Sequence, residues 1–109
     1  MEIQLKDNTC IITPLSPKLN KHEAERLFDE IDHQREKVGL DLSIVQDCTI
    51  DFIEKLKMHK ELSLFNINSD IFALLIKMNL DKELNIFASE LDFCENKHKL
   101  LSRKFCIVS

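Results

Sequence analysis

Short apolar runs alternate with amphipathic stretches along almost the whole chain of 109 residues, and this alternation constrains the fold more than any other feature. The predicted order is a hairpin of two strands, followed by helices and strands in turn. Strands that alternate with helices form right-handed crossovers and a mostly parallel sheet. We therefore predict a single α/β domain over residues 1–109, with a small, mixed, mostly parallel sheet and about four helices packed mainly on one face.

The first 13 residues are typical of a β-hairpin. Ile3 and Leu5 precede the pair Asp7-Asn8, and an apolar run over 10–12 follows it. Asp and Asn favour tight turns, so we expect the chain to reverse at this pair. Two prolines, at positions 14 and 17, then end the strand pairing.

The pair Asn20 and Glu23 forms a capping-box pattern, which predicts where the first helix begins. Apolar residues follow at helical spacing: Ala24, Leu27, Phe28 and Ile31. This spacing predicts an amphipathic helix of about five turns. The only glycine, Gly39, lies just past the expected helix end, where a left-handed cap or a close approach to a strand favours glycine.

Three further apolar runs predict strands: 38–45, 62–66 and 84–87. The first is typical of a strand that is buried on both faces. The residues Asp47-Cys48-Thr49 form a short polar break after it.

Helical spacing predicts three more helices, over 50–60, over 68–78 with caps at Asn68-Ser69-Asp70, and over 89–101. The last residues, 103–109, form an apolar tail. We expect this tail to be an edge strand or to dock on the sheet.

Composition excludes several classes of function. Fifteen basic residues are interspersed with 19 acidic ones, for a net charge of −4, so no basic surface for nucleic acid is expected. A single glycine rules out a glycine-rich phosphate loop, and with it a P-loop enzyme or a Rossmann dinucleotide binder. No apolar run approaches the ~20 residues of a membrane-spanning helix, and the first residues lack a secretory signal. We therefore expect a cytoplasmic protein without membrane insertion.

The titratable side chains predict no catalytic or metal site. The cysteines form no CxxC pair, so free buried thiols are expected and zinc is not: Cys10, Cys48, Cys94 and Cys106. The histidines stand among charged residues and are expected in solvent: His22, His33, His59 and His98. No nucleophile–base set accompanies Asp41 and Asp51, so we expect neither catalysis nor a cofactor. Asp41 is expected to bind the backbone of the loop that follows it.

Three stretches, in this order, carry a resemblance to a known family. The stretch Val38–Val45 is similar to an apolar strand that ends Asp-Leu-Ser-x-Val. The stretch Leu62–Ser69 resembles a strand that ends in Asn before a helix starting at Ser. Leu80-Asp81 before Leu84-Asn-Ile-Phe87 resembles a helix end and a last strand. Together they resemble the STAS domain, the family of anti-sigma factor antagonists and of sulfate-transporter C-terminal domains. The resemblance spans nearly the whole chain.

The chain departs from the family pattern just before residue 50. There the family has roughly Ile-Asp-Ser-Ser/Thr-Gly-Leu, and the hydroxyl directly after the Asp is the phosphoacceptor. Counted without gaps from Asp41, Ile50 takes the acceptor place, and this register keeps Ile53 facing the core. Thr49 is the remaining candidate phosphoacceptor, although an N-cap for the following helix explains it better. We expect no standard serine phosphorylation switch.

The resemblance implies a non-enzymatic regulatory module that binds proteins through the loop and helix over 47–58. The candidate partner-binding residues are Asp47, Thr49, Ile50, Asp51, Phe52, Lys55, Asn66 and Ser69. For Phe52 two interpretations stay open, an exposed interface anchor or core packing beside Ile53 and Leu56.

The implied partner is an anti-sigma factor of the serine-kinase class. One alternative is an accessory subunit that binds the ATPase of an ABC lipid transporter. Another is a sensor of a small ligand or nucleotide, with a cleft near Asp41, Thr49 and Asn66. A homodimer through the N-terminal strand or the tail also stays open.

Overall fold

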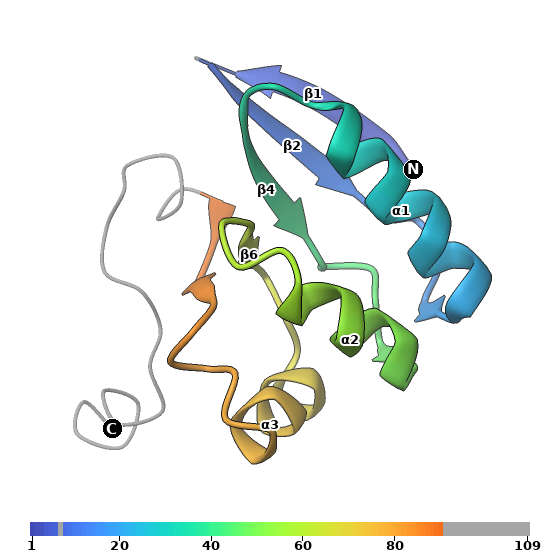
Figure 1. The fold of residues 1–109 in the computed structure, drawn as a ribbon, viewed down its shortest axis with the longest axis vertical. Helices are drawn as coiled ribbons and strands as arrows, with labels where there is room; N and C mark the ends of the chain where they lie inside the picture. The colour runs from blue at the N-terminus through green and yellow to red at the C-terminus, as the bar shows by residue number, and fades with distance from the viewer. Residues whose placement is uncertain (7, 91–109) are drawn as a thin grey trace.

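The computed structural model describes residues 1–6 and 8–90 (Figure 1). Its main sheet has five strands in the spatial order β1 (Glu2–Lys6), β2 (Thr9–Thr13), β4 (Lys37–Asp41), β6 (Ser63–Phe65) and β7 (Asn85–Phe87). The helices of the described part are α1 (Lys21–His33), α2 (Ile50–Lys57) and α3 (Ser69–Lys77). Two short strands, β3 (Lys18–Leu19) and β5 (Asp47–Cys48), form a second sheet. The protein is thus an α/β domain with a mixed sheet, as the alternation predicts.

The N-terminal hairpin is confirmed. Strand β1 pairs antiparallel with β2, and Ile3 lies opposite Ile12. Asn8 has a φ of 67°, in the left-handed region that asparagine tolerates better than most residues. The predicted turn chemistry therefore reverses the chain where expected.

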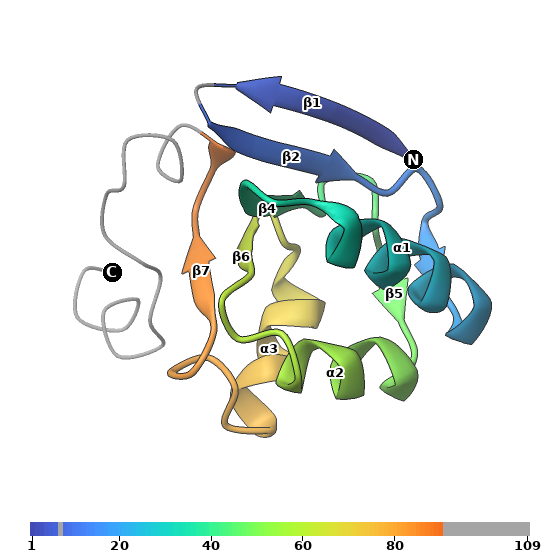
Figure 2. The same ribbon diagram turned by 45° about the horizontal axis from the view of Figure 1, so that its top comes forward.

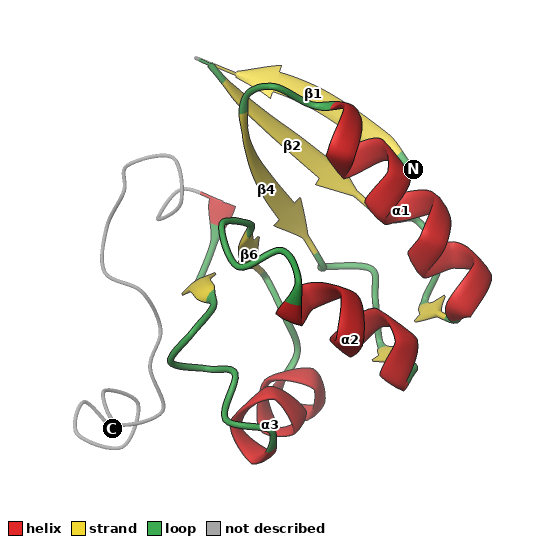
Figure 3. Cartoon of the chain, viewed as in Figure 1, coloured by secondary structure: helices red, strands yellow, loops and turns green. Residues whose placement is uncertain are grey.

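The remaining strands of the main sheet are parallel, and each crossover moves one place further in the same direction along the sheet. Crossovers of one hand that advance in one direction place their helices on one face. Buried residues of all three helices accordingly join a single core with one face of the strands, which includes Cys10, Ile12, Leu40, Leu64 and Ile86. Figures 2 and 3 show α1, α2 and α3 arranged on this side of the sheet. The opposite face holds a small cluster of Ile11, Phe65 and Phe87.

The first helix is shorter than predicted. Helix α1 has 13 residues, about three and a half turns, because no apolar residue follows Ile31 at helical spacing. Gln34 adopts an extended conformation and its N–H bonds to the Ile31 carbonyl. Gly39 lies within β4, beside Ile11 of β2, and no glycine has a positive φ. The left-handed cap at Gly39 was therefore a wrong prediction.

The segment after β4 also differs from the prediction. The strand ends at Asp41, and the chain turns because the Val45 N–H bonds to the Leu42 carbonyl at 3.1 Å. Residues 47–48 are β5, which pairs with β3, so this segment is more than a polar break. Both N–H groups at positions 46 and 47 donate to the Pro17 carbonyl. Pairing of two-residue strands leaves no periodic signal in a sequence, which explains the error.

Several predictions lie outside the described residues, namely most of the helix over 89–101, the tail over 103–109, Cys94, Cys106 and His98. Strands near 62–66 and 84–87 are confirmed as β6 and β7. Among the described helices, none combines the length and the apolar composition that a membrane span requires.

Candidate protein-binding surface around helix α2

Polar side chains at the carboxyl ends of β4 and β6 bind each other. Asp41, the last residue of β4, accepts hydrogen bonds at Oδ1 from the Ser43 N–H at 3.0 Å and from Nδ2 of Asn66 at 3.1 Å. Asn66 holds a φ of 57° directly after β6. The predicted role of Asp41 is confirmed, since its carboxylate fixes the backbone of the following loop. Asn66, a candidate partner residue, is half-buried in this contact.

Asn68 connects the start of α3 to the loop that precedes α2. Its Oδ1 accepts from the Ile71 N–H at 2.8 Å, which caps α3 as predicted. Its Nδ2 also donates to the carbonyls of Val45 at 3.2 Å and Gln46 at 3.0 Å. This second role was missed, because a contact across more than 20 residues has no local signal.

Thr49 occupies the N-cap position of α2, but its side chain makes no capping bond. Its Oγ1 donates instead to the Leu19 carbonyl at 3.2 Å, and its N–H donates to the same oxygen at 3.0 Å. The side chain is turned toward β3 because β3 and β5 run side by side up to this point. The predicted position is therefore confirmed, and the predicted capping bond is wrong. As a candidate phosphoacceptor, Thr49 is half-buried with its hydroxyl engaged.

Phe52 lies in the core, with no exposed surface. Its ring centroid is 5.8 Å from that of Phe28 on α1, and Ile53 and Leu56 are equally buried beside it. The interpretation of Phe52 as an exposed anchor is wrong, because α2 begins at Ile50 and this phase turns position 52 toward α1 and the sheet.

His59 is also less exposed than predicted. Its side chain is 16% exposed, and its ring centroid lies 4.7 Å from that of Phe28. Its Nε2 is 2.9 Å from Oδ1 of Asp32 on α1. The surrounding charged residues suggested solvent, but His59 joins the segment after α2 to α1.

The outward face of α2 carries exposed apolar side chains at both ends. Ile50 is 57% exposed and Met58 is 79% exposed, with Glu54 exposed between them. The three positions lie four residues apart and therefore share one side of the helix. Half-buried Asp51 and Lys55 flank them. We call these five residues, Ile50, Asp51, Glu54, Lys55 and Met58, the α2 surface.

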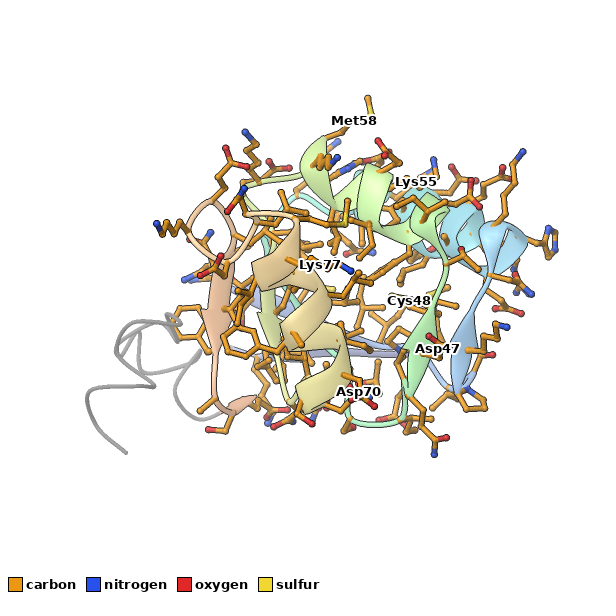
Figure 4. All side chains as sticks on the ribbon, turned by 90° about the horizontal axis from the view of Figure 1, so that it is seen from below. Asp47, Cys48, Lys55, Met58, Asp70 and Lys77 are labelled. Atoms are coloured by element: carbon orange, nitrogen blue, oxygen red, sulfur yellow. The ribbon has the colours of Figure 1, made fainter. Side chains whose placement is uncertain are left out.

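Strand β5 and helix α3 continue the α2 surface on the same side of the molecule. Figure 4 views this side, with Lys55 on α2 and Met58 directly after it, Asp47 and Cys48 on β5, and Asp70 and Lys77 on α3. Asp47 and Ser69, both candidate partner residues, are exposed. The structure thus brings α2, β5 and α3 together, as the prediction requires, but holds Asn66 back against Asp41.

Charge is distributed unevenly along α2. Asp47 precedes the helix and Asp51 lies in its first turn, whereas Glu54 lies near the middle. Basic residues gather toward its C-terminal end: Lys55, Lys57 and Lys60. Asp51 in the first turn and Lys55 and Lys57 in the last turn complement the local sign of the helix dipole. A matching partner would present basic groups at the start of α2 and acidic groups at its end.

The Cys48 thiol stands two residues before α2, and its reactivity is suppressed. Burial, and secondarily the negative charge of Asp47, raises the pKa of the Cys48 thiol to about 11. The thiolate, which is the reactive form, is therefore scarce at neutral pH.

Two cavities of the described part lie away from the α2 surface. A cavity of about 520 Å³ lies at the other end of the sheet, between the end of α1 and Leu62, and one of about 270 Å³ lies beside Leu15 and Leu27. Over residues 1–6 and 8–90, no three His, Cys, Asp or Glu side chains are grouped as metal ligands. Compared with known proteins, the chain matches no protein-family model and no curated protein sequence.

Proposed function

We propose that this protein is a non-enzymatic regulatory module that binds a protein partner through the α2 surface, in the manner of an anti-sigma factor antagonist. The observation that carries the proposal is Ile50, whose side chain is 57% exposed at the first residue of α2. Binding is favoured when a partner removes exposed apolar side chains at a helix end from water. In the family that the sequence resembles, this position contacts the partner and carries the phosphoacceptor.

The arrangement of the chain supports a STAS-like fold as part of this proposal. An N-terminal hairpin precedes three parallel crossovers, and the described helices share one face of the sheet. Strand β4 ends at the Asp of the Asp-Leu-Ser sequence, and the segment over 42–49 leads from it into α2. Asp41 and Asn68 stabilise that loop from two sides. A rigid support of this kind keeps the α2 surface in one conformation for recognition.

The proposed module lacks the serine phosphorylation switch. Ile50 has no hydroxyl, and the hydroxyl of Thr49 donates to the Leu19 carbonyl. Protein purified from its source cells should therefore carry no phosphate at residue 50 and at most traces at Thr49. Intact-mass and peptide mass spectrometry measure this directly. Stoichiometric phospho-Thr49 would contradict a constitutive mode of binding.

The proposed partner is an anti-sigma factor of the serine-kinase class. The test is a pull-down from source cells with the tagged wild-type chain, read by mass spectrometry. The matched variants are Ile50→Glu, within the α2 surface, and Leu15→Glu, at a site 52% exposed beside α1. Both introduce the same charge at an exposed apolar position, so neither should disturb the core.

Recovery of a kinase-like anti-sigma factor with the wild type and Leu15→Glu, but not with Ile50→Glu, would support the proposal. If a transporter ATPase is recovered with the wild type and Leu15→Glu but not with Ile50→Glu, the protein is instead an accessory subunit of an ABC transporter. Equal recovery with all three baits would exclude the α2 surface as the binding site. The sensor alternative gains no support at Asp41 and Asn66, because these side chains already bond to each other.

A further inference from the structure

Within residues 1–6 and 8–90, strand β1 pairs only with β2 and forms one edge of the main sheet (Figure 2). All five of its residues are exposed. Exposed edge strands present unpaired backbone groups that can accept another strand, and proteins commonly protect them with charge, bulges or a covering segment. Strand β1 carries charge at its two ends, Glu2 and Lys6, and between them two well-exposed apolar side chains, Ile3 at 43% and Leu5 at 66%.

The side chains of β1 divide between the two faces of the sheet. Ile3 lies opposite Ile12, and Leu5 lies opposite Cys10. Residues directly opposite in an antiparallel pair project to the same side, so Ile3 and Leu5 stand on the face that carries the helices. Their partners are fully buried, but Ile3 and Leu5 are not. Glu2, Gln4 and Lys6 alternate with them and therefore stand on the opposite face.

This sequence complements itself when two copies run antiparallel. With Gln4 opposite Gln4, each Glu2 faces a Lys6 and each Ile3 faces a Leu5. A two-fold axis repeats both pairs, as an isologous interface requires. A shift by one residue would place charged side chains opposite apolar ones on the wrong face. A shift by two would leave either Glu2 or Lys6 without an opposite residue in the strand. The Gln4-centred register alone matches charge and apolar character over all five residues.

We propose that the protein forms a homodimer in which β1 pairs antiparallel with β1 of a second copy, with the two-fold axis at Gln4. The five strands of each copy then form one continuous sheet. Lys6 also bonds to Glu90 of its own chain at 2.6 Å, with both side chains partly exposed, so the Glu2 of the second copy joins an existing ion pair. A contact of one short edge strand is small, and the dimer is accordingly weak and reversible. This proposal is independent of the α2 surface, which no β1 residue enters.

The decisive experiment exchanges the charges of the predicted pair. Glu2→Lys alone places two lysines opposite each other at both ends of the interface, and Lys6→Glu alone does the same with two glutamates. Each variant alone should dimerise about tenfold or more weakly than the wild type, since like charges directly opposite destabilise strand pairing. An equimolar mixture of the two variants restores opposite charges at both ends, and so should form heterodimers with wild-type affinity. Sedimentation velocity over a concentration series measures the dissociation constants of the wild type, of each variant and of the mixture.

Lys77→Glu makes the same change of charge as Lys6→Glu, but on α3. It is the matched control and should dimerise like the wild type. Circular dichroism melting shows that each variant is folded before its mass is compared. A wild type that stays monomeric up to about 1 mM would overturn the proposal. Dimerisation unaffected by either single substitution would place the interface elsewhere and would also overturn it. Failure of the mixture to recover, with both variants folded, would overturn the Gln4-centred register.

Discussion

The two faces of helix α2 contain side chains of the same class but meet opposite environments. On the inner face Phe52, Ile53 and Leu56 have no exposed surface, whereas on the outer face Ile50 and Met58 are 57% and 79% exposed. The difference depends on where the helix begins, since each residue turns the side chain by about 100°. The start of α2 is positioned by contacts with distant segments, the Leu19 carbonyl and the Asn68 side chain. Apolar character therefore does not distinguish core from interface here, and helical phase does.

The largest difference in unfolding free energy is expected between Phe52→Ala and Ile50→Ala. Removal of the buried ring should cost about 3–5 kcal/mol of unfolding free energy, because it leaves a cavity against Phe28. Removal of the exposed side chain should change stability by no more than about 0.5 kcal/mol. Urea unfolding followed by circular dichroism measures both. The milder Phe52→Leu keeps the comparison measurable if the alanine variant is largely unfolded at 25 °C. Similar losses for positions 50 and 52 would show that the helix has a different phase.

The next largest effect is expected at Asn68, which holds the loop before α2. Asn68→Ala removes the α3 cap and two hydrogen bonds to the loop, and should cost about 2 kcal/mol. Asn68→Asp retains the acceptor that caps α3 but loses both donors, so its loss should be smaller. Thermal melting of the three proteins under one set of conditions compares them. Equal losses in the two variants would mean that the cap itself contributes nothing.

A smaller loss is expected at Thr49, directly before α2. Thr49→Val keeps the shape of the side chain but removes the donor to the Leu19 carbonyl, which retains the Thr49 N–H as a partner. The expected cost is about 1 kcal/mol. Thr49→Ser keeps the hydroxyl and serves as the control in the same urea titration. A Thr49→Val protein as stable as the wild type would show that this hydrogen bond does not help to position α2.

The smallest effect concerns Cys48, which lies beneath the start of α2. Its pKa is raised from 9.0 to about 11, so alkylation of native protein by iodoacetamide at pH 7–8 should be slow and should accelerate up to that pH. The unfolded thiol ionises first as the pH rises, so the stability linked to this group is present below pH 9 and is lost between pH 9 and 11. Asp47→Asn should lower the pKa and speed the reaction modestly. Peptide mass spectrometry follows position 48 by itself, and rapid labelling at pH 7 would contradict its burial.

Local sequence signals predicted the elements whose causes are local. Asn8 reverses the hairpin, Asn20 and Asn68 cap their helices, and β6 and β7 lie where the apolar runs indicated. A side chain that bonds three residues away, or a turn of two residues, needs nothing beyond its own neighbourhood. Helix α1 was predicted to be too long. Charged residues are compatible with a solvent-exposed helix, so those that follow its apolar stripe gave no signal that the helix ends.

Within the candidate site, the pattern located the surface but not the orientation of its residues. The prediction of α2 with Ile53 and Leu56 on its inner face is confirmed. Asp47 and Ser69 are exposed, and their role in partner binding stays a prediction. The sequence alone did not decide the role of Phe52. Ile53 and Leu56 already define a buried stripe on the helix, and Phe52 beside them could be either buried or exposed. His59 was misplaced because its partners, Phe28 and Asp32, belong to another helix.

The amino-acid sequence by itself determined the order of the main-sheet strands and of the described helices, the parallel character of the sheet and the amphipathic stripes, because periodicity and capping act over a few residues. The tertiary structure alone decided that Thr49 bonds to β3, that Asn68 holds the loop before α2, and that β1 remains an open edge. The first two depend on contacts between residues more than 20 positions apart. The third depends on the described sheet having no strand beyond β1. Such contacts form only when the whole core packs, because the free energy that orders them comes from burial shared by every element.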